Sequence, residues 1–144
     1  MTSIEENKAL ARRWCEEFNT QNWAGIVAIT APDFVQHGAP PGIAADLAGH
    51  KQLMTALWTA FPDAHQVNDE LIAEGDKVVE RYTVRGTHKG AFMGIPPTGK
   101  HVSVSALGID RIKDGKIVET WISMDTFGLL RQLGAIPQVA PTRA

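Results

Sequence analysis

The sequence predicts one α+β domain in which N-terminal helices pack against one face of a cone-shaped, curved and mostly antiparallel sheet. Apolar residues recur at helical spacing as far as residue 61, and strand-like runs separated by short turns follow from residue 65. Helices followed by mostly consecutive antiparallel strands are typical of α+β proteins. A chain of 144 residues is long enough for one such domain with its own core. We expect the domain to span residues 1–136 and the polar, proline-containing tail 137–144 to be loosely ordered.

Three helices are expected before the strands. The first begins at Ser3, whose hydroxyl can cap a free backbone N–H, while the Glu6 carboxylate can satisfy another in a capping box. A short second helix is expected over residues 23–30 and is ended by Pro32, because the residue before a proline disfavours the helical conformation. The third helix is expected over residues 50–61, where apolar side chains fall along one side.

Five strands and a short final helix complete the predicted order. The strands are expected over residues 33–37, 65–73, 77–88, 101–112 and 117–124, and the helix over residues 126–133. An Asp114-Gly115 dipeptide joins the last two strands, as is typical of a tight hairpin turn. The loop before these strands carries His88 and the adjacent prolines Pro96 and Pro97, so we expect it to form the rim of a ligand pocket.

The composition excludes several kinds of partner. A formal charge of −2 and a pI near 6.2 leave no basic patch for nucleic acid and no polybasic membrane anchor. No apolar run approaches the roughly 20 residues of a membrane helix. Cys15 is the single cysteine, which excludes an intramolecular disulfide and fits a cytoplasmic location. Because helices cover one face of the predicted sheet, we expect the other face to be covered in a homodimer.

The motifs of metal, nucleotide and hydrolase sites do not occur in this sequence. The five histidines include no pair at the i, i+4 spacing of a helical zinc site, so no metal is expected. No glycine-rich phosphate loop and no Gly-x-Ser-x-Gly elbow occurs, so neither a nucleotide cofactor nor a hydrolase triad is predicted. The sequence therefore favours cofactor-free acid–base chemistry or plain binding.

Asp125, His37 and His88 are the candidate catalytic residues. Asp125 follows the last strand, where a carboxylate either caps the final helix or acts as an acid–base group at the mouth of an apolar cavity. His37 and His88 each end a predicted strand, where a histidine either satisfies a backbone carbonyl or moves a proton near pH 7. Both interpretations stay open at each position.

Gln36, Arg81 and Trp121 are the candidate substrate-binding residues. The Gln36 amide can orient a carbonyl or hydroxyl group, or form a surface hydrogen bond. Arg81 lies in the middle of a predicted strand, where a buried guanidinium favours pairing with Glu119 or Asp125. Trp121 either stacks on a ligand or fills the core. Side chains alternate across a strand, and the sequence leaves open which set faces the cavity.

Three runs of the sequence resemble a known family. They are G-T-H-K-G-x-F-x-G-I-P-P-T-G-K at residues 86–100, D-G-K-I-V-E-T-W at residues 114–121 and G-L-L-R-Q-L-G at residues 128–134. Together they resemble the SnoaL-like polyketide cyclase, or ester cyclase, family of the nuclear transport factor 2-like superfamily. The resemblance extends from about Asn7 to Gly134 and implies a cone-shaped α+β barrel with a cavity between helices and sheet.

The resemblance also implies a chemistry. Cyclases of this family close a ring by intramolecular aldol condensation, with an Asp as the acid–base group and without metal or cofactor. In this sequence that Asp corresponds to Ile122, a second active-site His to Gly108, and a substrate-contacting Asn to Gln36. His88 matches the family's Gly-x-His-x-Gly element, and Asp125 matches a separate downstream Asp. Two positions that are polar in the family are therefore not polar in this sequence: Ile122 is apolar and Gly108 has no side chain.

These observations predict a cofactor-independent enzyme that transfers a proton next to a carbonyl in an apolar, oxygenated small molecule, by aldol-type cyclisation or isomerisation. Asp125 is the expected acid–base group, with His37 and His88 as its proton partners. Gln36 is expected to orient the substrate, and Trp121 and Arg81 to form the pocket wall. Two alternatives stay open: a non-catalytic small-molecule binding or dimerisation module, and a hydratase or hydrolase that uses the same cavity.

Overall fold

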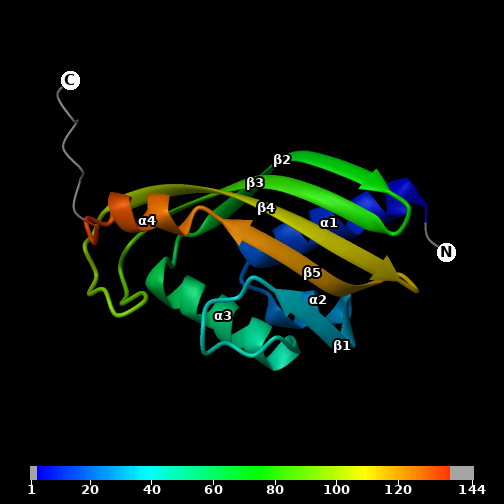
Figure 1. The fold of residues 1–144 in the computed structure, drawn as a ribbon, viewed down its shortest axis with the longest axis horizontal. Coiled ribbons are helices and arrows are strands. Elements are labelled where there is room, and N and C mark those ends of the chain that lie inside the picture. Colours follow the sequence, from blue (N-terminus) through cyan, green and yellow to red (C-terminus); the bar gives the residue numbers. More distant parts are fainter. Residues whose placement is uncertain (1–2, 137–144) are drawn as a thin grey trace, which may run out of the picture.

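Five strands form one curved sheet in the order β1-β5-β4-β3-β2 (Figure 1). The computed structural model describes residues 3–136, so the tail predicted at residues 137–144 lies outside the described residues. The strands are β1 (Thr30–His37), β2 (His65–Glu74), β3 (Lys77–Thr87), β4 (His101–Lys113) and β5 (Lys116–Met124). β1 runs parallel to β5, and the other neighbouring strands are antiparallel.

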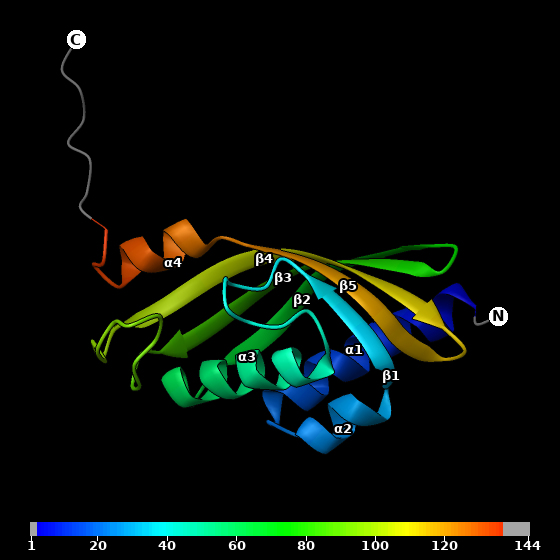
Figure 2. The same ribbon diagram turned by 60° about the horizontal axis from the view of Figure 1, so that its bottom comes forward.

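Three helices lie against one face of this sheet (Figure 2). They are α1 (Ile4–Asn19), α2 (Trp23–Ala28) and α3 (Leu47–Ala60). A fourth helix, α4 (Thr126–Gln132), follows β5 and packs near the end of β4. N-terminal helices on one face of a curved, mainly antiparallel sheet confirm the predicted α+β class. Within residues 3–136, no helix is long and apolar enough to cross a membrane.

Two local predictions are confirmed by the backbone. The Ser3 hydroxyl accepts a hydrogen bond from the Glu6 N–H at 3.1 Å, so α1 begins at the predicted cap. Asp114 and Gly115 form the turn between β4 and β5 with φ angles of 53° and 73°. Two successive positive φ angles are typical of the turn that matches the twist of a hairpin.

Two helix boundaries differ from the prediction. α2 ends at Ala28, short of the predicted residue 30, and Pro32 lies inside β1. The pairing of β1 with β5 is irregular between Thr30 and Val35, and an edge strand with interrupted pairing tolerates a proline that donates no hydrogen bond. α3 begins at residue 47 rather than residue 50, because the Asp46 side chain accepts a hydrogen bond from a backbone N–H in the first turn.

The alternation of side chains on β4 and β5 decides which residues face the helices. Val104 on β4 is buried under the helices, whereas its near neighbour Leu107 faces outwards and is 52% exposed. On β5, Ile122 and Met124 face the helices and Trp121 faces the other side of the sheet. The structure therefore settles the strand parity that the sequence left open.

Candidate functional site

An apolar cavity of about 340 Å³ lies between the helices and the inner face of the sheet. Its walls come from α1, α3, α4, all five strands of the sheet, and the loops that follow β1 and β3. The lining side chains are mostly aliphatic and aromatic, among them Phe18, Met54, Leu57, Phe61, Val84 and Leu129. A volume of this size is typical of sites that bind small organic molecules.

The loop between β3 and β4 contributes Phe92 to the cavity wall, and His88 holds this loop in place. His88 is fully buried, and its Nδ1 accepts a hydrogen bond from the Thr98 N–H at 3.2 Å. Its ring packs against Phe61 with 5.4 Å between the ring centres. Phe61 lines the cavity, so His88 supports the wall from behind.

A smaller space of about 20 Å³ adjoins the apolar cavity and is lined by polar side chains as well as apolar ones. These polar residues include His50, Glu80, Asp110 and Thr120. The residues that line both spaces are Trp14, Gln66, Tyr82 and Ile122. The smaller space has room for about one water molecule or one hydroxyl group. The cavity therefore has an apolar body and a small polar end.

Glu80 on β3 and Asp110 on β4 form a buried pair of carboxyl groups at the polar end, each only 6% exposed. Burial, reinforced by the neighbouring Asp110, raises the pKa of Glu80 well above its ordinary value, and burial also raises the pKa of Asp110. The Thr120 hydroxyl donates a hydrogen bond to Asp110 Oδ1 at 2.7 Å, which favours the ionised form of Asp110. These shifts favour a pair that shares one proton at neutral pH, with Glu80 the more readily protonated member.

His50 on α3 lines the same space and is neutral. Its Nδ1 lies 3.0 Å from Gln36 Oε1, and Gln36 Nε2 donates a hydrogen bond to the Ala44 carbonyl at 2.9 Å. Because the second bond fixes the orientation of the amide, His50 Nδ1 must carry the proton and Nε2 is a bare acceptor. Burial lowers the pKa of His50 to about 4. Neither His50 Nε2 nor Glu80 Oε1 has a hydrogen-bond partner among residues 3–136.

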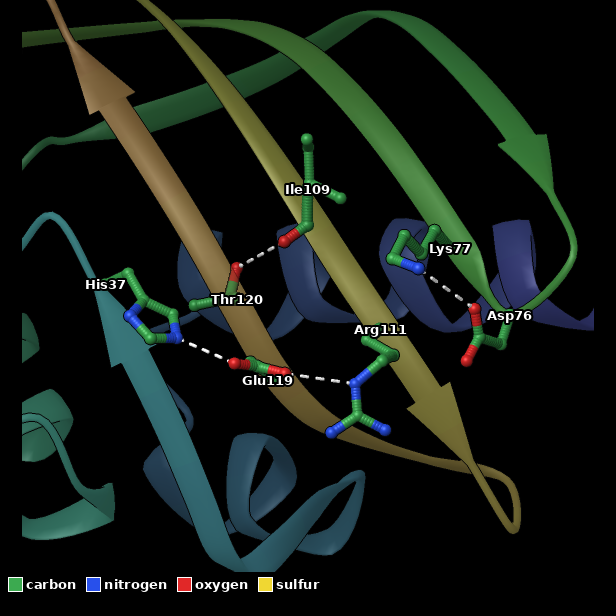
Figure 3. Close-up of polar contacts among 7 residues, drawn as sticks. All are labelled: His37, Asp76, Lys77, Ile109, Arg111, Glu119 and Thr120. Atoms are coloured by element: carbon green, nitrogen blue, oxygen red, sulfur yellow. Dashed lines mark hydrogen bonds and ion pairs between the residues drawn. The ribbon is translucent and has the colours of Figure 1, made fainter.

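His37 and Trp121 lie on the outer face of the sheet, away from the cavity. Figure 3 shows Glu119 between His37 and Arg111, with His37 Nε2 2.7 Å from Glu119 Oε2 and Arg111 Nε 3.0 Å from Glu119 Oε1. The His37 ring stacks on Trp121 with 5.1 Å between the ring centres. The hydrogen bonds from His37 and then Arg111 lower the pKa of the Glu119 carboxyl. These residues form an exposed polar cluster rather than part of the cavity wall.

Asp125 is the N-cap of α4 and is exposed. Its Oδ1 accepts a hydrogen bond from the Gly128 N–H at 2.9 Å. The next residue, Thr126, lines the apolar cavity, whereas Asp125 does not. Of the two interpretations of Asp125, the geometry fits helix capping.

The expected environment of Arg81 is wrong. Its side chain is 52% exposed and lies 3.9 Å from Asp69 and 3.8 Å from Glu70, not beside the carboxylates predicted for it. The physical reason is strand parity, because Arg81 pairs with the outward-facing Leu107 of β4. Of the six predicted site residues, only Gln36 lines the cavity.

Three residues of the polar end are absent from the sequence prediction: His50, Glu80 and Asp110. On β3 the inward positions run Val78, Glu80, Tyr82, so an acidic side chain interrupts a buried and otherwise largely apolar set. A buried acid is costly unless it is protonated or paired, and such an interruption is the signal that could have identified Glu80. To use that signal one must know which side chains of the strand face inwards, and the sequence left this open.

The polar end is suited to proton transfer and hydrogen bonding. It combines a neutral imidazole acceptor with two buried carboxyl groups whose pKa values are raised, and a carboxyl pair that shares one proton can both give and take a proton near neutral pH. Tyr82 adds a hydroxyl donor, because burial and then the charges of Glu80 and Asp110 raise its pKa. Within residues 3–136, no three His, Cys, Asp or Glu side chains are grouped so as to hold a metal ion.

Comparisons with known proteins identify the relatives of this chain. The sequence model of the SnoaL-like polyketide cyclase family matches residues 9–133. Nogalonic acid methyl ester cyclase of Streptomyces nogalater is 31% identical over 123 residues, which cover 81% of this chain and 89% of that protein. Aklanonic acid methyl ester cyclase DnrD of Streptomyces peucetius is 29% identical over 129 residues, which cover 87% of this chain and 88% of that protein.

A solved structure is also similar to this chain over most of its length. AclR from Streptomyces galilaeus, a candidate hydroxylase, superposes with a TM-score of 0.86 and 36% sequence identity, covering 96% of this chain and 87% of AclR. The family match covers most of the chain, from α1 to the end of α4. The chain therefore belongs to the SnoaL-like polyketide cyclase family.

Proposed function

We propose that this chain is a cofactor-independent enzyme of the SnoaL cyclase type, which transfers a proton next to a carbonyl during ring closure or isomerisation of an apolar, oxygenated small molecule. The observation that carries the proposal is the apolar cavity of about 340 Å³, which adjoins a buried pair of carboxyl groups, Glu80 and Asp110. The two curated relatives described above are named as methyl ester cyclases. A neutral ester of polyketide type suits an apolar wall of this kind.

The Glu80–Asp110 pair is the proposed acid–base group, in place of Asp125. The ionised carboxylate takes a proton from the carbon next to a carbonyl, and the enolate carbon then attacks a second carbonyl of the same molecule to close the ring. The protonated carboxyl gives its proton to the new alkoxide, so the pair again holds one proton. Tyr82 lines both spaces and is placed to donate a hydrogen bond to the oxygen on which negative charge develops.

Glu80 supplies a polar group close to the two positions at which the family resemblance predicts a His and an Asp. Gly108 and Ile122, the positions where the family's His and Asp are expected, pair across β4 and β5 and line the same small space. Gly108 also pairs with Glu80 on its other side. A side-chain carbon at residue 108 would lie 3.9 Å from Glu80 Oε2, so the carboxyl of Glu80 uses the space beside the glycine. An acidic group is thus kept at this end of the cavity, on a different strand.

A substrate screen tests the proposal. Cyclic ketones, enones and β-keto esters are assayed for both turnover and binding with the unaltered protein. We expect turnover of at least one compound, and Glu80→Gln should reduce kcat by about 10²–10⁴-fold, the usual contribution of a general acid or base. Glu70→Gln, at an exposed position on β2, is the matched control and should leave kcat unchanged.

The alternative function is a non-catalytic small-molecule binding module. It predicts tight binding of one of these compounds without turnover by the unaltered protein. A Glu80→Gln variant that turns over substrate at the unaltered rate would remove the carboxyl pair from the mechanism. The two results separate the alternatives because only an enzyme needs the proton.

A further inference from the structure

We propose that the space between His50 and Glu80 is a subsite that selects a hydrogen-bond-donating hydroxyl group of the ligand, a phenol or an enol, over a carbonyl or an ether. This inference rests on the proposed function and adds to it the chemical class of the substrate end that reaches the polar space.

The hydrogen-bonding capacity of the subsite is fixed by its neighbours. His50 Nδ1 is used as a donor to Gln36 Oε1 at 3.0 Å, so the facing Nε2 can only accept. Glu80 Oε1 is the second polar atom of this space without a partner. It can only accept a hydrogen bond when the proton between Glu80 and Asp110 is on the other carboxyl oxygen of Glu80. Because both protein atoms accept hydrogen bonds, the ligand group that complements them is one that donates a hydrogen bond.

Burial makes this complementarity strongly selective. His50 is 2% exposed and Glu80 is 6% exposed, so bulk water does not reach these atoms freely. A buried acceptor left without a donor costs the full desolvation of that group, and sites of this kind reject ligands that lack the donor. The imidazole is also held rigidly, because its ring packs against Trp14, Trp23 and Phe34 with 5.8, 5.8 and 5.3 Å between the ring centres.

The size of the subsite limits what it accepts. A space of about 20 Å³ holds one oxygen atom with its hydrogen, while the rest of the ligand stays in the apolar cavity. A water molecule can donate to both acceptors at once. A ligand hydroxyl places its oxygen at the same point and donates to His50 Nε2. Trp14, Gln66, Tyr82 and Ile122 line both spaces, so the hydroxyl and the apolar body of one ligand can occupy them together.

A matched pair of ligands tests this selectivity at equilibrium, without any turnover. 2-Naphthol and 2-methoxynaphthalene share the same apolar body, but only 2-naphthol can donate a hydrogen bond. We expect 2-naphthol to bind the unaltered protein about threefold to tenfold more tightly in a fluorescence titration at pH 7, the range given by one net hydrogen bond. His50→Phe keeps an aromatic ring of similar size and removes one of the two acceptors, so it should lower the preference to what Glu80 Oε1 alone provides. His65→Phe, an exposed position at the start of β2, should preserve it.

A second measurement needs no variant. Nitrogen-15 NMR of the histidine rings should show the Nδ1–H tautomer for His50, and the Nε2 resonance should shift when 2-naphthol is added. An Nε2–H tautomer, or equal affinity for the two ligands, overturns the subsite while leaving the proposed function intact. Binding of neither ligand contradicts both, because the apolar cavity itself would then not accept a bicyclic body.

Discussion

The two faces of the sheet carry similar residue types in opposite environments. On the inner face, His50 lies with Glu80 and Asp110 in a space from which bulk water is largely excluded, and two of its polar atoms have no partner among the described residues. On the outer face, His37 and Arg111 satisfy the carboxylate of Glu119 in an exposed cluster. Burial raises the pKa of Glu80, whereas hydrogen bonds lower the pKa of Glu119. The same kinds of side chain are therefore buried and partly unpaired on one face and already satisfied on the other.

This difference shows what makes a chemical site in this fold. A histidine next to a carboxylate is an ordinary surface ion pair when solvent reaches both groups, and such pairs contribute little to stability. Where desolvation opposes charge, the carboxyl group keeps its proton and the histidine stays neutral. Residue type identifies candidates on both faces, but burial separates the proposed site from the surface cluster.

The largest expected effect comes from exchanging one carboxyl on each face for an amide. Asp110→Asn should lower kcat by about 10²–10⁴-fold, because an amide cannot share the proton of Glu80. Glu119→Gln removes a carboxylate of the outer cluster and should change kcat less than twofold. Steady-state kinetics on the compound found by the screen measures both, with circular dichroism to check that each variant is folded. Equal losses in the two variants would show that the faces do not differ in function.

The second prediction concerns the apolar part of the outer face. Ile72, Val79, Ile109 and Trp121 form a row across four paired strands, and Leu107 beside this row is 52% exposed. Charged residues of both signs, such as Arg81 and Glu70, lie next to the row. Two copies related by a two-fold axis could pack these rows together and pair opposite charges at the rim, so we propose that this face is the interface of a homodimer.

Light scattering tests the dimer. The unaltered protein should have twice the monomer mass of 15.7 kDa at micromolar concentration. Leu107→Glu places a charge directly beside the row, within the proposed interface, and should weaken self-association by about 100-fold or more, because an uncompensated charge at the core of an interface is costly. A mass of 15.7 kDa for the unaltered protein, or dimers that persist in Leu107→Glu, contradicts this interface.

The sequence predicts the order of elements well because local chemistry determines it. The cap at Ser3 and the turn at Asp114-Gly115 depend only on residues a few positions apart. The strand that contains Pro32 is harder to predict from local sequence, because a proline is tolerated only in an edge strand of the sheet. Which strand lies at an edge depends on the whole topology.

The candidate site is predicted poorly because it depends on contacts between distant segments. Glu80 and Asp110 are 30 positions apart in the chain and meet only through the pairing of β3 with β4. His50 joins them from α3, and its tautomer is set by Gln36 of β1. Residue type alone predicts that Trp121 and Arg81 line the pocket. The parity of their strands, which the sequence does not reveal, puts both side chains on the outer face.

A smaller effect is expected on the pH dependence of stability. The folded-state pKa of Glu80 is raised, so the folded protein keeps a proton that the unfolded chain loses as the pH rises above its ordinary value of about 4.5. The free energy of unfolding should therefore fall as the pH rises from this value towards the folded-state pKa. Glu80→Gln should weaken this dependence, although Asp110 with its own raised pKa remains, and should raise Tm at pH 8 by roughly 3–4 °C, which corresponds to about 1 kcal/mol in a domain of this size. Glu119, whose pKa is lowered, should make the free energy of unfolding rise with pH instead. If Glu80→Gln had the same pH profile of Tm as the unaltered protein, Glu80 would be ionised in the folded protein.

The smallest effect is expected at Asp125, where the two interpretations of the sequence meet the geometry directly. Asp125 Oδ1 accepts the Gly128 N–H at 2.9 Å, and the side chain is exposed at the start of α4. Asparagine caps helices about as well as aspartate, so Asp125→Asn should change Tm by less than about 2 °C, whereas Asp125→Ala loses the cap and should cost about 1 kcal/mol.

If Asp125 acted as the acid–base group, the Asn variant would lose most of its turnover, because an amide cannot take up the proton. We expect kcat to stay within about twofold instead, since the proton is handled at the polar end of the cavity. Thermal melts and steady-state kinetics on the Asn and Ala variants separate the two roles: a loss of kcat in both assigns Asp125 to the chemistry, and a loss of Tm in the Ala variant alone assigns it to the helix.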